Sequence, residues 1–414
     1  MFTRVKGTQD FLDLRLFNFI VDQAKNHLMT YHFTEIATPI LEHTQLFVRS
    51  LGMQTDVVSK QMFLIETKDD ETICLRPEAT AATVRAFVNN GIQQTPWNVF
   101  SWGPIFRYER PQKGRYRQFH QINIESIGAE TVIHDVQLIT MLDRFFHEKL
   151  MLNNYALLVN FLGCFDDRTA YKLVLKDFLD GQTSLCKTCM YRKDTNIMRV
   201  FDCKNTQCQI LYQQTPYITD HLCSSCSNEW RHIQYNLELL SVSYSHQPTL
   251  VRGLDYYNKT VFEFNSSNLG AQNAFCGGGR YDQLVGQIGA KQDYPSLGAA
   301  IGIERLILLL EPFQSTLPMP QLPSLYVIMP LDDEQHMIGL LLADQLRAQG
   351  LCIEVILDGG SIKNMMKKAN KMGAAYALII GADEQQAKEV TVKNMITGDQ
   401  KRISCVNVAE FLKG

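Results

Sequence analysis

The apolar positions of residues 1–311 follow helical periods in some stretches and strand periods in others. A helix is predicted over 11–32, where apolar residues recur at helical spacing: Leu16, Phe19, Ile20, Ala24, Leu28 and Tyr31. Short apolar runs predict strands at 35–41, 62–66, 72–75, 97–100, 121–127, 250–256, 260–264, 273–276 and 295–300. Further helices are predicted at 135–150 and 302–311. Many strands closed by a few helices favour an α+β fold around an antiparallel sheet.

The pattern changes after a tract at 311–323, whose four prolines predict a semi-rigid linker. Beyond it, apolar runs alternate with helical segments in the order typical of a parallel α/β domain, at 325–329, 333–349, 352–356, 361–372 and 377–380. We therefore expect one domain over 1–322 and a second over 323–414. Within the first, residues 155–245 stand apart as a helical, cysteine-rich insertion between two parts of the sheet.

Composition and charge narrow the classes of protein. The 414 residues are 45% hydrophobic and 20% charged, which is globular, and the net charge of −3 excludes binding to nucleic acid by bulk charge alone. No apolar run approaches the roughly 20 residues that span a bilayer, and none follows the N-terminus as in a secretion signal. We therefore expect a cytoplasmic protein without membrane contact, whose eleven cysteines are thiols or metal ligands and not disulfides.

The most informative chemistry lies in the stretch 106–121, where two strand segments flank a loop rich in cations. The loop carries Arg110, Lys113, Arg115 and Arg117. Guanidinium groups match phosphate oxygens, and Phe119 among them could lie against a base, so the loop suits a nucleotide or an RNA end. The alternative is a solvated basic hairpin.

Three further segments carry residues that could serve the same site. Glu78 and Thr80 at a strand end could hold an ammonium group, although a turn with a helix cap explains them equally well. Arg252 follows an apolar run and precedes two tyrosines, which an edge strand with aromatic packing would also explain. Arg305 falls in the first turn of a helix that begins at Gly302, where anions bind readily, although the segment could be an ordinary buried helix start.

Together, and in this order, the four segments resemble the signature of the class II aminoacyl-tRNA synthetases. The run from Arg252 to Tyr257 with that from Cys276 to Asp282 is similar to the histidyl members, and Lys6–Asp10 resembles their start. The resemblance covers nearly the whole chain and matches the insertion only loosely. It implies an antiparallel-sheet catalytic domain with a helical insertion, followed by an α/β anticodon-binding domain.

The resemblance also implies a reaction, in which histidine is activated with ATP and transferred to tRNA(His) by a homodimer. Pro39, expected in an edge or bent strand, matches the first motif, which builds the dimer interface. Arg107 and Arg252 are expected to flank the α-phosphate as the catalytic pair, with Mg²⁺ on the departing pyrophosphate. The other ATP-binding residues implied are Glu109 and Phe119 at the adenine, Arg115 at the terminal phosphates, and Arg305 at the adenine and γ-phosphate.

For the histidine pocket the resemblance implies a set of polar and aromatic residues. Glu78, Thr80 and Gln121 are expected at the ammonium group, and Glu125 and Tyr257 at the two imidazole nitrogens. The rest of the predicted pocket is Ala79, Arg107, Arg252, Tyr256, Tyr281 and the run Gly277–Gly279. Glu125 could instead be a surface acid, and Tyr281 a core aromatic. Ala79 replaces an expected glycine, and Ala299 and Ala300 replace a bulkier residue before Gly302, which puts the pocket's shape in question.

The insertion contains two Cys-x-x-Cys pairs that suggest a structural zinc site. The predicted ligands are Cys186, Cys189, Cys223 and Cys226, and Cys203 and Cys208 lie between the pairs. The gap between the pairs exceeds the usual spacing of roughly 15–20 residues, and free thiols are the alternative. Such a zinc site would leave no open ligand position for catalysis, and we expect a helical insertion beside the active site to grip the tRNA acceptor arm.

In the C-terminal domain, Lys363, Lys367 and Lys371 fall on one face of a capped helix. They form either a phosphate-binding stripe or a merely solvated face.

Three other functions compete with histidine activation. The regulatory subunit of ATP phosphoribosyltransferase resembles the catalytic domain, but it lacks the C-terminal module and loses the phosphate-binding arginines. Another class II synthetase, prolyl or threonyl, would share the C-terminal module but not the segment from Arg252 to Tyr257. A regulatory domain that senses uncharged tRNA would usually lie in a longer chain with a kinase.

Overall fold

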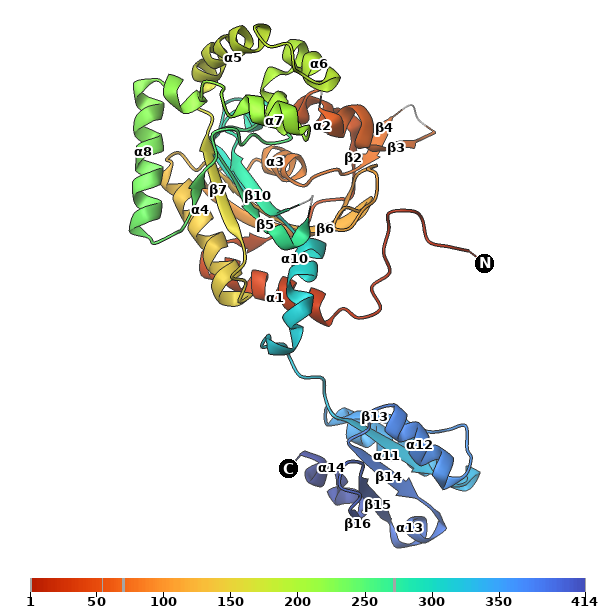
Figure 1. Ribbon diagram of the computed structural model, residues 1–414. Helices are drawn as coiled ribbons and strands as arrows, with labels where there is room; N and C mark the ends of the chain where they lie inside the picture. Colours follow the sequence, from red (N-terminus) through yellow and green to blue (C-terminus); the bar gives the residue numbers. More distant parts are fainter. Residues whose placement is uncertain (1, 54, 69–70, 271–272, 414) are drawn as a thin grey trace. The chain divides into compact units, whose positions relative to one another are not determined.

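The computed structural model describes residues 2–53, 55–68, 71–270 and 273–413. The chain divides into two compact units, Met1–Met319 and Pro320–Gly414, and the division falls inside the proline-rich tract (Figure 1). No helix in the described part of the chain is long and apolar enough to cross a membrane.

The first unit is built on a sheet with the strand order β1-β5-β6-β11-β10-β9-β7-β8. All pairs from β5 to β7 are antiparallel, while the edge strands β1 and β8 are parallel to their neighbours. The bounds are β1 (Thr34–Glu35), β5 (Trp97–Phe106), β6 (Gln118–Ile127), β7 (Ala156–Phe161), β8 (Ser245–His246), β9 (Asn258–Asn265), β10 (Ala274–Arg280) and β11 (Ser296–Gly302). The expected antiparallel-sheet fold is therefore confirmed.

The two faces of this sheet differ because side chains alternate along each strand. On β6, Ile122 and Ile124 enter the core that the sheet shares with α1 (Arg15–Thr30), α4 (Ile133–Arg144), α8 (Ser224–Leu239) and α10 (Ile303–Leu310). Gln121 and Asn123 point to the opposite face, where they line a cavity. A second core on that side contains residues of α2 (Thr44–Leu51), α3 (Thr80–Asn89), α9 (Leu284–Ile288) and the insertion.

A small sheet of order β2-β4-β3 is separate from the central sheet and carries several exposed apolar side chains. Its strands are β2 (Leu41–His43), β3 (Phe63–Glu66) and β4 (Thr72–Leu75). The strand predicted at 35–41 is wrong, because the chain around Pro39 passes from β1 in the central sheet to β2 in this one.

The strand predicted at 250–256 is also wrong, since this segment forms a loop. Two backbone carbonyl groups near the start of the loop are hydrogen-bonded by a side chain and not by a neighbouring strand. The Asn160 amide donates to the carbonyl oxygens of Pro248 and Leu250, each at 3.0 Å. Leu250, Tyr256 and Tyr257 are nevertheless buried, which explains why the run is apolar.

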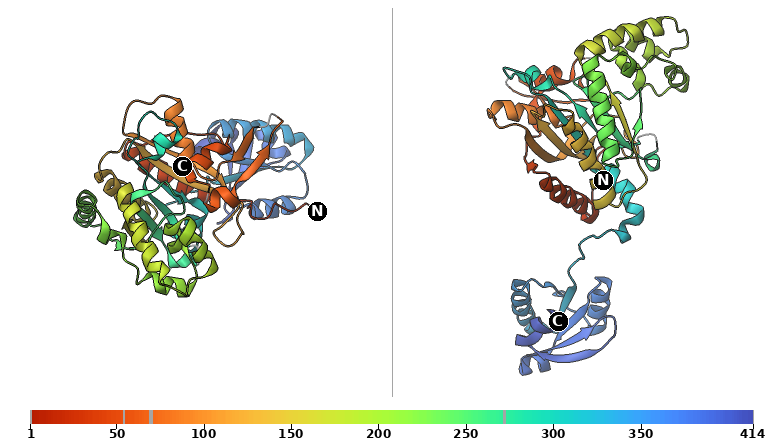
Figure 2. Two further views of the ribbon diagram at one scale, coloured as in Figure 1. Left: turned by 90° about the horizontal axis from the view of Figure 1, so that it is seen from above. Right: turned by 90° about the vertical axis from the view of Figure 1, so that its left-hand side faces the viewer.

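The helical insertion is shorter than 155–245. Its first strand, β7, belongs to the central sheet, and α8 packs against α4 as part of the main core. The remaining helices are α5 (Phe165–Asp180), α6 (Lys187–Thr195) and α7 (Thr206–Tyr212), which gather at one end of the unit (Figures 1 and 2).

The second unit has a sheet of order β13-β12-β14-β15-β16. The three predicted strands β12 (Leu325–Pro330), β13 (Cys352–Val355) and β14 (Tyr376–Ile380) are parallel as expected. The antiparallel strands β15 (Glu389–Asn394) and β16 (Gln400–Ser404) were not predicted. The helices are α11 (Asp333–Ala348), α12 (Ile362–Lys371), α13 (Ala382–Ala387) and α14 (Val408–Lys413).

Candidate active site

A cavity of ≈ 580 Å³ opens on the sheet face opposite α1 and α4. Side chains of β6, β9, β10 and β11 form part of its wall, together with the loops 107–116 and 252–257. Arg107, Arg252 and Arg305, which come from three distant parts of the sequence, all line it. Three guanidinium groups around one cavity make a strong site for a polyanion.

Arg107 is held at the end of β5. Its Nε donates to the Pro77 carbonyl oxygen at 2.8 Å, and its guanidinium carbon lies 5.6 Å from the centre of the Phe119 ring. Burial lowers the pKa of Arg107, against the attraction of Glu78. The charge is therefore held in a partly desolvated position, where an incoming anion relieves an unfavourable burial.

Arg305, in the first turn of α10, ties that helix to the arginine-rich loop. Its Nε donates to the Gly114 carbonyl oxygen at 3.0 Å, and its Nη1 donates to the Ala274 carbonyl oxygen. Burial first, and then repulsion from Arg107 and Arg115, lower the pKa of Arg305 to about 10. Arg305 is therefore still positively charged near neutral pH, and nearby negative charges do not fully balance the cluster that it forms with Arg107 and Arg115.

Arg252 reaches the cavity from the 252–257 loop and pairs with Glu263 on β9. Burial is the largest single effect and would lower the pKa of Arg252, but the attraction of Glu263 together with that of Tyr257, Cys276 and Tyr256 outweighs it, so the net pKa is raised. Gly277 leaves space for the guanidinium, since a Cβ there would lie 2.6 Å from an Arg252 nitrogen. The Nε of Arg252 is buried and has no hydrogen-bond partner among the described residues.

On the ATP side, Glu109 and Arg115 form an ion pair with each other. Both line the cavity, so the two residues expected at the adenine and at the terminal phosphates are paired with each other in this structure.

The expected ammonium site is built around the start of α3. The Glu78 carboxylate accepts from the backbone N–H of Thr80 at 2.7 Å and of Ala81 at 2.8 Å, so it caps the helix. Burial raises the pKa of Glu78, although these hydrogen bonds oppose the rise. The cap reading of this segment therefore holds, but the capping group is Glu78 and not Thr80.

Glu125 on β6 is fully buried and bridges two hydroxyl groups. The Thr80 hydroxyl donates to one oxygen at 2.6 Å and the Tyr281 hydroxyl donates to the other. Burial raises the pKa of Glu125 to about 8. Gly298 on β11 makes this possible, because a Cβ there would lie 1.8 Å from a Glu125 oxygen.

Most predicted site residues line the cavity. They are Glu78, Ala79, Thr80, Arg107, Glu109, Arg115, Phe119, Gln121, Arg252, Tyr256, Tyr257 and Arg305. Glu125 and Tyr281 are not among the lining residues; they are 1% and 0% exposed, so they lie behind the wall and reach it through Thr80. The reading of Glu125 as a surface acid is therefore wrong, whereas Tyr281 is indeed a buried aromatic, with its hydroxyl bonded.

Some cavity residues were not predicted, although the sequence contained a signal for two of them. Asn123 follows from alternation, because it lies two residues from Gln121 on the same strand face. Glu263 is an acid inside the apolar run from Val261 to Phe264 of β9, which is a signal in itself. Arg192, Arg199 and Lys204 of the insertion also line the cavity, and nothing in their local sequence announces it.

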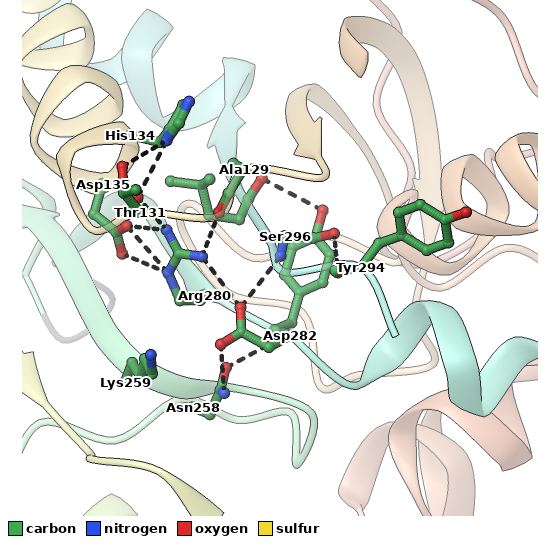
Figure 3. A network of polar contacts seen from close by, with 12 residues as sticks. Ala129, Thr131, His134, Asp135, Asn258, Lys259, Arg280, Asp282, Tyr294 and Ser296 are labelled. Atoms are coloured by element: carbon green, nitrogen blue, oxygen red, sulfur yellow. Dashed lines mark hydrogen bonds and ion pairs between the residues drawn. The ribbon is translucent and has the colours of Figure 1, made fainter. Parts of the chain in front are cut away.

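Behind the cavity, the end of β10 is fixed by a closed network around Arg280 (Figure 3). This buried guanidinium donates to both oxygens of Asp135, to Asp282 at 3.2 Å, and to the carbonyl oxygens of Ala129 at 2.7 Å and Thr131 at 2.9 Å. Because Tyr281 follows Arg280 directly, the network fixes the backbone that carries the Tyr281 hydroxyl to Glu125.

The structure does not bring the four predicted zinc ligands together. Among the described residues, Cys186 and Cys189 group with Cys203 and Cys208, whereas Cys223 and Cys226 group with Cys164 and Asp167. The predicted set of four is corrected accordingly. The physical reason is that Cys186 and Cys223 begin different helices, α6 and α8, whose first turns do not meet in one ligand group.

The antiparallel sheet and the arginine-lined cavity define the catalytic unit of a class II aminoacyl-tRNA synthetase. The histidyl-tRNA synthetase family model matches residues 20–306, and an anticodon binding domain model matches 326–414. The chain therefore belongs to the histidyl-tRNA synthetase family.

Individual relatives agree over the full length. The histidine–tRNA ligase of Halothermothrix orenii is 41% identical over 415 residues, covering 99% of this chain and 98% of that protein. That of Nitratidesulfovibrio vulgaris (strain DP4) is 42% identical over 416 residues, with 99% and 98% covered. The crystal structure of apo Staphylococcus aureus histidyl-tRNA synthetase aligns with a TM-score of 0.82 at 30% identity, and both chains are fully covered. The competing functions considered from the sequence are thereby set aside.

Proposed function

We propose that this chain activates histidine with ATP in the ≈ 580 Å³ cavity and then transfers it to the 3′ end of tRNA(His). Membership of the family makes it an aminoacyl-tRNA ligase that uses ATP. The observation that carries the assignment of the cavity is the convergence of Arg107, Arg252 and Arg305 on it.

In the first step the histidine carboxylate attacks the α-phosphorus of ATP, the bond to the bridging oxygen breaks, and pyrophosphate leaves. The carboxylate is already a nucleophile, so the step needs positioning and charge stabilisation more than a base. We assign Arg107 and Arg252 to the two sides of the α-phosphate, where they stabilise the charge that builds in the transition state. Their location on one cavity supports this assignment.

We assign Phe119 and Glu109 to the adenine, and Arg115 and Arg305 to the outer phosphates. This assignment requires the ion pair between Glu109 and Arg115 to separate when ATP binds, because each partner then has its own ligand group. Mg²⁺ on the pyrophosphate is part of the proposal. Glu304, which lines the cavity and whose oxygens accept from the His120 backbone N–H at 2.9 Å, would supply a carboxylate, and Mg²⁺ bound to nucleotides typically takes only one or two carboxylates besides the phosphate oxygens.

For histidine, we assign Glu78, Thr80 and Gln121 to the ammonium group and Glu125 and Tyr257 to the imidazole. A carboxylate has roughly four lone-pair positions, so the two hydroxyl groups on Glu125 leave it further acceptor capacity. Direct contact with the substrate then requires the cavity floor beside Thr80 to open. A pocket that hydrogen-bonds both imidazole nitrogens rejects isosteric analogues by factors of about 10⁴ or more.

For tRNA we propose two contact regions. A second cavity of ≈ 410 Å³, which shares Arg252 and Tyr257 with the first, is lined on the insertion side by cations that suit the acceptor arm: Arg168, Lys172, Lys176 and Lys193. In the C-terminal unit, Lys363, Lys367 and Lys371 are exposed on α12, whereas Met365 and Ala369 of the same helix are buried. That arrangement suits a stripe of phosphate contacts.

A homodimer and a cytoplasmic location complete the proposal. Apolar side chains beyond Pro39 are exposed, Ile40 by 39%, Leu41 by 53% and Leu64 by 68%, which supports a subunit contact at the small sheet. The eleven cysteines are free, as expected in a reducing compartment. Zinc at a four-cysteine site would be structural, because such a site leaves no open position for substrate.

The test is ATP–pyrophosphate exchange with each of the twenty amino acids in turn. We expect exchange with histidine alone. Exchange with proline or threonine instead would overturn the proposed specificity, and the absence of exchange with any amino acid would overturn the assignment of the cavity.

A further inference from the structure

The segment between α5 and α8 contains short helices that bury few side chains of their own. Within α6, which is described in full, Cys189 is the only buried residue, and α7 buries Cys208, Leu211 and Tyr212. The cysteines of this segment converge beside Ile197, Val200, Leu211 and Tyr212, in the core that the segment shares with α2, α3 and α9.

The first group, Cys186, Cys189, Cys203 and Cys208, has the geometry of a tetrahedral thiolate site. Its four sulfur atoms all lie within 4.8 Å of one another, and those of Cys186 and Cys203 are 3.7 Å apart. The edge of a zinc–thiolate tetrahedron is roughly 3.8 Å, from Zn–S bonds of about 2.3 Å. The 3.7 Å separation is also far beyond the roughly 2.05 Å of a disulfide bond. The sulfurs are too close together to surround a cluster of several irons, in which different irons take different cysteines.

Polar groups around the sulfur atoms suit thiolates. The backbone N–H of Cys186 donates to the Cys208 sulfur at 3.4 Å, and that of Asn205 donates to the Cys203 sulfur at 3.4 Å. The Tyr212 hydroxyl is buried without a hydrogen-bond partner of good geometry among the described residues, and it lies beside Cys189, whose thiolate it would stabilise. Donors that point at metal-bound sulfur are a common outer shell of such sites.

The second group has a structural explanation that needs no metal. Asp167 accepts from the backbone N–H of Cys164 at 3.1 Å and of Cys223 at 2.9 Å, so its two oxygens already join the starts of α5 and α8. The Cys223 sulfur caps α8 by accepting from the Cys226 N–H at 3.5 Å. In the first group, by contrast, Cys186 begins α6 without capping it.

The first group also holds a segment that braces the 252–257 loop. Between Cys189 and Cys203, the Asn196 amide donates to both oxygens of Asp255 at 3.0 Å, and Arg199 donates to the Gly253 carbonyl oxygen at 3.1 Å. Both contacted residues follow Arg252 within three positions of the sequence.

We propose that Cys186, Cys189, Cys203 and Cys208 bind one structural zinc ion that fixes the segment 187–202 against the loop carrying Arg252. The spacing agrees once this set is chosen, since Cys186 and Cys189 have two residues between them and Cys203 and Cys208 have four, within the usual range of about two to four. The metal site does not depend on the ligase activity. Only its effect on Arg252 rests on the proposed function.

The test measures metal content of the full-length protein by mass spectrometry, in the parent and in matched Cys→Ser variants. We expect about one zinc per chain in the parent, loss of zinc in Cys203→Ser and Cys208→Ser, and retention in Cys223→Ser and in the exposed control Cys352→Ser. Zinc retained without Cys203 or Cys208, or lost without Cys223, would overturn the assignment.

A second measurement needs no variant and so is independent of folding defects. Cobalt(II) added to the parent after removal of its zinc should give the intense thiolate-to-cobalt charge-transfer absorption of a tetrahedral site, and absence of that absorption overturns the proposal. Removal of zinc should also lower kcat of pyrophosphate exchange, with recovery when zinc is restored. A protein that binds zinc but gives no exchange with histidine contradicts the proposed function and leaves the metal site standing.

Discussion

Two arginines in the catalytic unit, the buried Arg280 and the partly exposed Arg252, have opposite surroundings. Arg280 is 1% exposed and each of its five N–H groups has an acceptor, in the network of Figure 3. Arg252 is 21% exposed at the side chain, pairs with Glu263, and keeps a buried Nε without a partner among the described residues. Arg280 follows Gly279 and Arg252 precedes Gly253, yet only Arg252 lines a cavity.

The difference shows how binding capacity can be recognised in a structure. A saturated guanidinium has no donor left for a ligand, so its role is to hold the fold. A guanidinium at the edge of a cavity with a buried donor that has no partner can satisfy that donor by binding an anion. Substitutions at the two positions should therefore affect different properties.

The largest effect is expected on stability, from Arg280→Ala. The change leaves the Asp135 carboxylate buried without its partner, and removal of one member of a buried ion pair typically costs about 3–5 kcal/mol. Urea unfolding of the catalytic unit measures this, with the double variant Arg280→Ala/Asp135→Ala expected to recover part of the loss. Unchanged unfolding in Arg280→Ala together with lost exchange would mean that Arg280 acts on the substrate.

Arg252→Ala should instead reduce catalysis and leave stability nearly unchanged. Loss of one preorganised donor at the developing charge typically lowers kcat by about 10²–10³-fold, and pyrophosphate exchange with histidine measures it. The exposed Arg110, in the arginine-rich loop but not on the cavity wall, is the matched control, and Arg110→Ala should retain exchange. Equal kcat in Arg252→Ala and the parent would remove Arg252 from the mechanism and erase the contrast with Arg280.

A smaller effect is expected from the pH dependence that Glu125 gives to the ligand-free protein. Burial raises its pKa from 4.5 to about 8, so between these values the unfolded chain releases the proton that the folded chain keeps. This contribution to stability is complete below about pH 4.5 and is lost as pH rises to about 8. At roughly 1.4 kcal/mol per unit, about 2–3 kcal/mol is lost between about pH 5 and pH 7.

The variant Glu125→Gln tests this, because the glutamine amide has nearly the same shape but does not titrate in this pH range. Thermal unfolding of both proteins across that range should show the parent losing stability relative to the variant as pH rises. If stability depends on pH in the same way in both proteins, Glu125 is charged in the folded protein. Glu125 would then be a group available to a ligand, as Arg252 is, and not part of a closed network, as Arg280 is.

Much of the fold and the site followed from sequence patterns. The helical period at 11–32 predicted α1, the strand segments of the central sheet predicted β5, β6 and β9 to β11, and the resemblance to the class II synthetases implied the arginines of the cavity. The wrong predictions share one feature, which is that a local pattern was interpreted without knowledge of which elements meet. The segment predicted as a strand at 250–256 forms a loop, and the predicted zinc ligands were chosen by their motif and not by their proximity in space.

What the sequence determined by itself is the set of local periods and residue types, because helices and strands impose fixed repeats and phosphate binding requires particular side chains. The tertiary structure alone decided which distant groups meet. Thr80 reaches Glu125, Arg252 pairs with Glu263, and Cys186 meets Cys203. Such contacts depend on how the helices and strands pack against one another. The same packing determines the burial that keeps a proton on Glu125 and the distances between thiols that would fit a metal ion.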